Sequence, residues 1–114
     1  MSYDLINELQ QKNRELSASI RQLRKSGTAK AEAEKQYKIQ LRIEALKLRE
    51  EGMAVSMIDK VVFGIPEVAE LRFKRDIADT VYQANIEAIN STKLQMRLIE
   101  NQISREWGNS NGNL

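Results

Sequence analysis

The feature that most constrains the fold is a run of about 42 residues, from Pro66 to Trp107, in which no glycine and no further proline interrupts the helical pattern. As one α-helix this run is about 63 Å long. A compact chain of 114 residues has a radius of gyration of only about 13 Å. Such a helix therefore protrudes unless a second long helix covers its apolar side.

The segment 3–51 supplies that second helix, because it is rich in Ala, Glu, Lys, Leu and Arg and is interrupted by Gly27 alone. Its length as a helix is about 73 Å, which is close to that of the helix predicted over 66–107. We therefore predict an all-α single domain over residues 1–107: a long antiparallel helical hairpin, coiled-coil-like, with a short connector helix within 52–65.

Glycine and proline set the predicted boundaries. Gly52 ends the first helix, since glycine adopts the left-handed conformation at low cost. Pro66 suits the first turn of the second helix. The polar tail 108–114 is predicted to be disordered. A turn at Gly27 would instead give a three-helix bundle, which is the alternative fold.

Apolar residues spaced by heptads predict the surfaces on which the two helices meet. In the first helix, Leu9, Leu16 and Leu23 form one row, and a second row is formed by Ile6, Asn13 and Ile20. In the second helix the main stripe consists of Leu71, Ala78, Tyr82, Asn85, Ile89, Thr92, Met96, Ile99, Ile103 and Trp107. Antiparallel pairing at positions whose numbers sum to about 118 places Tyr37 opposite Val81 and Leu9 near Trp107.

The first helix carries two apolar stripes on opposite sides. One contains Tyr37 and Leu41, and the other consists of Ile39, Ile43 and Leu46. One partner helix cannot cover both sides, so the pattern predicts a homo-oligomer or a three-helix arrangement. The connector is also unusually apolar, which is typical either of a plug for the open end of the hairpin or of a docking surface. For the second case we predict further partner or oligomer contacts at Met57, Val61, Val62, Phe63 and Phe73. For Phe73 two interpretations stay open, an exposed anchor or a cover over the connector helix.

Net charge is +2, from 18 basic and 16 acidic side chains, which does not demand a nucleic-acid partner. A local basic cluster lies between residues 21 and 30. Nucleic-acid contacts, if made, are predicted at Arg21, Arg24, Lys25, Lys30, Arg72, Lys74, Arg75, Lys93 and Arg97. A solvated helix face is the simpler interpretation of these residues.

Composition argues against an enzyme. The chain has no cysteine and no histidine, so a thiol nucleophile, a zinc–thiolate site and the commonest general base are all excluded. Its carboxylates are better explained as surface ion pairs. We predict no catalytic residue, cofactor or metal. The sequence also shows no transmembrane run and no secretory signal, which predicts a protein of the cytoplasm without membrane contact.

Three segments, Glu50–Gly52, Glu67–Asp76 and Ile103–Gly108, resemble small uncharacterised helical proteins encoded by phages and prophages of Gram-positive bacteria, over residues 23 to 108. The resemblance implies a bacterial host cell. It also implies an early gene near single-strand annealing recombinases and single-strand DNA-binding proteins. It assigns no functional residue.

Together these observations lead to the hypothesis of a non-enzymatic phage accessory protein. It would self-associate and bind a protein or nucleic-acid partner in DNA recombination or replication. A protein-only inhibitor of a host enzyme or defence system is the first alternative, with the apolar connector as its anchor. A component of virion assembly, such as a scaffold, is the second.

Overall fold

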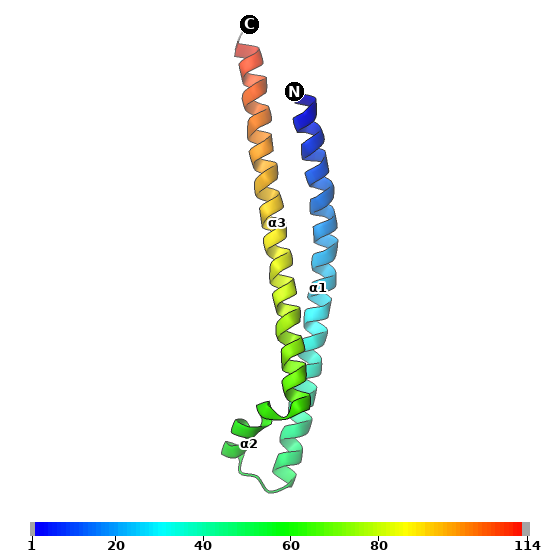
Figure 1. Cartoon of the computed structure of the whole chain (residues 1–114), viewed down its shortest axis with the longest axis vertical. Helices are drawn as coiled ribbons and strands as arrows, with labels where there is room; N and C mark the ends of the chain where they lie inside the picture. The colour runs from blue at the N-terminus through cyan, green and yellow to red at the C-terminus, as the bar shows by residue number, and fades with distance from the viewer. Residues whose placement is uncertain (1, 113–114) are drawn as a thin grey trace. The chain divides into compact units, whose positions relative to one another are not determined.

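A computed structural model describes residues 2–112 of the chain. It contains α1 (Ser2–Glu50), α2 (Val55–Val61), the 3-10 helix η1 (Val62–Gly64) and α3 (Pro66–Gly112) (Figure 1). The predicted all-α hairpin with a short connector helix is confirmed. Because α1 continues through Gly27, the turn required by the three-helix alternative is not formed.

The end of α1 is determined by Gly52. This residue has a φ of 90°, the positive region that favours glycine. Its N–H donates to the carbonyl of Arg49 at 3.0 Å, and the N–H of Met53 donates to the carbonyl of Leu48 at 3.1 Å. These two bonds form a Schellman motif, which satisfies carbonyls at the end of the helix and turns the chain into the connector.

The second long helix begins where the sequence predicts. Pro66 is its first residue, and the N–H of Ala69 donates to the carbonyl of Ile65 at 2.9 Å. The C-terminal end differs from the prediction, since α3 continues past Trp107 to Gly112. No proline follows Trp107, and one glycine lowers helix stability by only about 1 kcal/mol. The last two residues of the predicted disordered tail, 113 and 114, lie outside the described residues.

The chain divides into two compact units. One dividing point falls inside α1 and the other inside α3. The connector unit comprises Lys25–Gln83, and the terminal unit comprises Met1–Arg24 with Ala84–Leu114. In the connector unit the buried side chains are Ser26, Tyr37, Ile58, Val62 and Val68. In the terminal unit, among the side chains described, only Ile89 and Ile99 are buried.

The register within the connector unit differs from the predicted one. Lys30 contacts Asp79, Glu34 contacts Arg75, and Gly27 faces Tyr82, so paired positions sum to 109 and not to about 118. The predicted sum is wrong because it treats the connector as a simple loop. Instead α2 and η1 lie along the last turns of α1, where Arg42, Ala45 and Ile58 line a common groove. The first residues of α3 therefore lie beside the middle of residues 40–50, and not beside their end.

Of the two rows predicted for α1, one faces inward as predicted and the other does not. Leu9, Leu16 and Leu23 are partly buried as predicted, whereas Ile6 and Ile20 are exposed. The other side of the seam is formed by Leu5, Lys12, Ser19 and Ser26. Short serine side chains let two helices approach closely, and the lysine stem covers apolar surface with its aliphatic carbons.

The stripe predicted for α3 faces inward from Leu71 to Ile103, and all of its members are partly or fully buried in that range. Trp107 is an exception, with 68% of its surface exposed. The prediction for Trp107 is wrong because a spacing of alternately three and four residues continues from Ile99 and Ile103 to Glu106. Glu106 is indeed partly buried, and Trp107 lies outside the seam.

Candidate interaction surfaces

The clearest candidate surface is a stripe on α1, formed by Ile39, Ile43 and Leu46. These side chains are 46%, 41% and 44% exposed. At 100° per residue they lie nearly opposite Tyr37, which is 5% exposed and faces the hairpin core. Three large aliphatic side chains at i, i+4 and i+7 on a solvent face are typical of a helix that packs against another chain. We call this set the α1 stripe.

The connector presents a second apolar surface. Met57, Val61 and Phe63 are exposed as expected for partner contacts, and Val55 is exposed beside them. Val62 does not belong to this surface, because it is 3% exposed and packs inside the connector unit. Its position at the start of η1 turns it inward, next to Ile58, with which it lines one groove. Sequence periodicity could not separate these neighbours, because the change from α-helix to 3-10 helix shifts the phase.

Phe73 is the third candidate. Its side chain is 58% exposed, which favours the interpretation of an exposed anchor over that of a cover for the connector helix. Phe63 is the phenylalanine engaged there, with the Arg72 guanidinium 5.3 Å from its ring centroid. Ile77 and Val81 are exposed one and two helical turns beyond Phe73. The sequence prediction paired Val81 with Tyr37, whereas Ala78 and Tyr82 are the side chains of this part of α3 that face inward.

A groove runs between α1 and the connector helix. Its larger part has a volume of about 330 Å³ and is lined by Lys38, Leu41, Arg42, Ala45, Ile58, Asp59, Val62 and Phe63. A smaller part, of about 190 Å³, shares Arg42, Ala45, Ile58 and Asp59 with it and adds Leu46, Arg49 and Val55. The shared residues make the two parts continuous. We call this space the α1–α2 groove.

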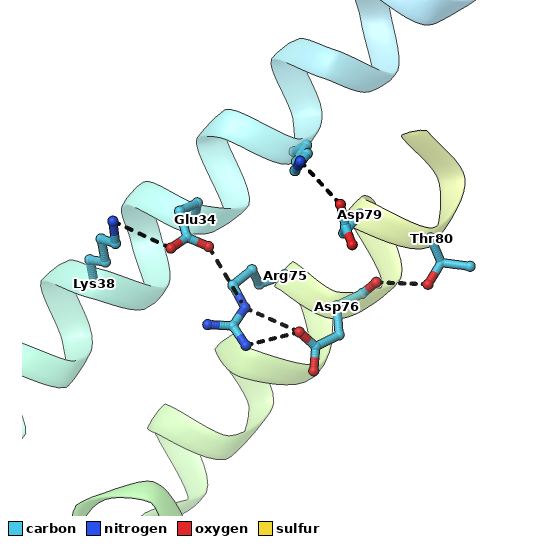
Figure 2. A network of polar contacts seen from close by, with 7 residues as sticks. Glu34, Lys38, Arg75, Asp76, Asp79 and Thr80 are labelled. Atoms are coloured by element: carbon cyan, nitrogen blue, oxygen red, sulfur yellow. Dashed lines mark hydrogen bonds and ion pairs between the residues drawn. The ribbon is translucent and has the colours of Figure 1, made fainter. Parts of the chain in front are cut away.

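Two of the predicted nucleic-acid contacts are engaged in ion pairs between helices (Figure 2). Arg75 lies 3.7 Å from Glu34 and 3.0 Å from Asp76, and its guanidinium is 4.4 Å from the ring centroid of Tyr37. The hydrogen bond to Asp76 raises the pKa of Arg75 above its ordinary value. These contacts fix the guanidinium against the hairpin and leave little of it for a phosphate.

Lys30 is the other engaged cation. Its Nζ lies 3.1 Å from Asp79 and 4.9 Å from the centroid of the Tyr82 ring. The hydrogen bond from Lys30 lowers the pKa of the Asp79 carboxyl, and the charge of Lys30 acts in the same direction. Lys30 and Arg75 therefore connect α1 to α3 within the connector unit, and we interpret both as structural residues.

The remaining predicted contacts are divided between the two units. Lys25, Arg72 and Lys74 belong to the connector unit, whereas Arg21, Arg24, Lys93 and Arg97 belong to the terminal unit. All seven are exposed. Lys93 and Arg97 line a groove of about 260 Å³ with Leu16, Met96 and Glu100. This is the one place where two of the predicted cations share a described cavity.

No group of three or more acidic, cysteine or histidine side chains is placed to hold a metal ion among the described residues. None of the described helices carries an apolar stretch long enough to cross a bilayer. The surfaces of the described part of the chain are thus apolar stripes, grooves and ion pairs.

In comparisons with known proteins, no protein family, no curated protein and no solved structure matches the chain.

Proposed function

We propose that this chain is a self-associating helical interaction module that acts by binding and not by catalysis. The observation that carries the proposal is the α1 stripe, which exposes three aliphatic side chains on the side of α1 away from Tyr37. In water this face favours contact with another apolar face, because each buried Å² contributes about 25 cal/mol. A second copy of the chain always offers such a face.

Light scattering coupled to size exclusion tests the proposal. We expect the wild-type chain to elute at a multiple of 13.1 kDa, and we expect Ile43→Glu to elute at the monomer mass with unchanged helicity. Gln22→Glu, at an exposed position of α1 outside the stripe, is the matched control and should keep the wild-type mass. A wild-type monomer at all concentrations up to about 1 mM, well above the μM affinities of weak specific complexes, would overturn the proposal.

A second candidate function, nucleic-acid binding, rests on Lys93 and Arg97, which lie at i and i+4 on α3 and line one groove. It predicts that affinity for single-stranded or double-stranded DNA falls steeply with salt, because bound counterions are released. Anisotropy titrations at two salt concentrations, with Lys93→Gln/Arg97→Gln as the variant, measure this. Absence of binding at low salt contradicts it.

A further inference from the structure

The α1–α2 groove combines an apolar floor with a cationic rim. Leu41, Ala45 and Ile58 lie along the floor, and Phe63 closes one end of it. Ile58 is buried, so this part of the floor is held by the core and does not depend on a ligand. A lining of this kind accepts aliphatic side chains from another molecule.

The rim carries three cations and one acid. Lys38, Arg42 and Arg49 line the groove, and Asp59 is the only carboxylate among the described residues that line it. Lys38 is held by Glu34 at 3.4 Å. No carboxylate of the described residues lies within ion-pair distance of the guanidinium groups of Arg42 and Arg49. The rim therefore has positive charge in excess, on side chains that point to solvent.

The two parts of the groove follow α1. Leu41 lines the larger part and Arg49 the smaller part, while Ala45 lines both. Positions 41, 45 and 49 are one helical turn apart, so the groove offers two adjoining spaces along two turns of helix. Two aliphatic side chains at i and i+4 of a bound helix have this spacing.

We propose that the α1–α2 groove docks an acidic amphipathic helix of a partner protein. Two aliphatic side chains of that helix fill the two parts of the groove, and carboxylates on the flanking positions bind Arg42 and Arg49. Charge complementarity is what selects this occupant, because a basic or neutral helix gains nothing from the rim. The proposal does not depend on self-association, because Ile39 and Ile43 do not line the groove and only Leu46 belongs to both the groove and the α1 stripe.

The full-length protein can be tested by anisotropy with three labelled 18-residue helical peptides. All carry Leu at i, i+4 and i+7 on one face, and the flanking positions are Glu in the first, Gln in the second and Lys in the third. We expect the Glu peptide to bind at least fivefold more tightly than the Gln peptide and the Lys peptide to bind weakest. We also expect Arg42→Glu/Arg49→Glu to weaken the Glu peptide at least tenfold.

The charge-reversed variant gives the decisive control, because it should now prefer the Lys peptide over the Glu peptide. Lys74→Glu changes an exposed cation of α3 outside the groove and should leave all three affinities unchanged. Equal loss in the Lys74→Glu variant, or equal affinity of wild type for the Glu and Lys peptides, overturns the proposal. So does displacement of the Glu peptide by a single-stranded oligonucleotide, since the rim would then bind polyanions in general.

Repeating the titration on Ile43→Glu separates this proposal from self-association. Binding that survives in this variant supports the groove as an independent site. Loss of peptide binding together with the oligomer would place the peptide at the contact between copies and overturn the groove as its site. An oligomer that persists while no Glu peptide binds would overturn the docking proposal and leave self-association standing.

Discussion

The two units of the hairpin are built from the same two helices but are stabilised differently. The connector unit buries Tyr37 and Val68 and has ion pairs from Lys30 and Arg75 across to the other helix. In the terminal unit, Ile89 and Ile99 are the buried side chains among those described, and the ion pair that is resolved there, Lys12–Glu15, lies within α1. We therefore expect the connector unit to be the more stable of the two, because the aromatic and charged residues that join α1 to α3 lie in it.

The largest expected effect is that of Tyr37→Ala. The side chain is 5% exposed and its ring lies under the Arg75 guanidinium, so the variant loses both burial and a cation–π contact. Large aromatic-to-alanine changes in cores cost about 3 to 5 kcal/mol, and we expect a loss near the lower end in this slender fold. Urea denaturation followed by circular dichroism measures it. Ile99→Ala, in the terminal unit, should cost less, and an equal or larger cost would contradict the comparison.

An intermediate effect is expected at Gly27. A β-carbon there would lie 3.3 Å from the Tyr82 ring, although alanine in a helix is favoured over glycine by about 1 kcal/mol. We expect Gly27→Ala to stabilise the Tyr82→Ala variant by about this amount and the wild-type chain by clearly less. Thermal denaturation of the four proteins gives the coupling. The same effect in both backgrounds would show that the ring does not restrict this position.

A smaller effect is expected for the pair formed by Lys30 and Asp79. Both side chains are partly exposed, and exposed pairs contribute little to stability. A double-mutant cycle with Lys30→Met and Asp79→Asn should give a small, favourable coupling free energy. The pair Lys12 and Glu15, with Lys12→Met and Glu15→Gln, is the control in the terminal unit. A larger coupling there would reverse the comparison.

The smallest effect is on the pH dependence of stability. The folded-state pKa of Asp79 is lowered by Lys30, so its contribution is present above the unfolded pKa of about 3.9 and is lost as pH falls through the folded value. The stability difference between wild type and Asp79→Asn should be constant above about pH 5 and shrink toward pH 3. Urea titrations at fixed salt measure this difference. A difference that grows on acidification would contradict the direction of the shift.

Much of the fold can be predicted from the sequence because its determinants are local. Gly52 and Pro66 set the boundaries, and the seven-residue spacing of Leu9, Leu16 and Leu23 identifies an inward row. The opposite placement of Tyr37 and the α1 stripe also follows from 100° per residue. Each of these features needs only the geometry of a single helix.

The register and the surfaces that depend on it could not be predicted in this way. The register between α1 and α3 depends on how much of α1 the connector covers. The periodicity of the sequence carries no information on that length. An error of nine positions, or about two and a half turns, placed Val81 opposite Tyr37, whereas the Tyr37 ring lies against Arg75. The α1–α2 groove was missed for the same reason, since it exists only once α2 lies beside Arg42 and Ala45.

The contact of Gly27 with Tyr82 has a consequence for the identity of the folded state. Two long helices with repeating seams can slide past each other by one heptad, about 10 Å, and still bury leucine against leucine. A β-carbon at Gly27 would lie 3.3 Å from the Tyr82 ring, so the ring fits beside glycine at this position. A shift by one heptad would bring the ring against the side chain of Glu34. The smallest residue of α1 thus selects one alignment among several that hydrophobicity alone would leave nearly equal in energy.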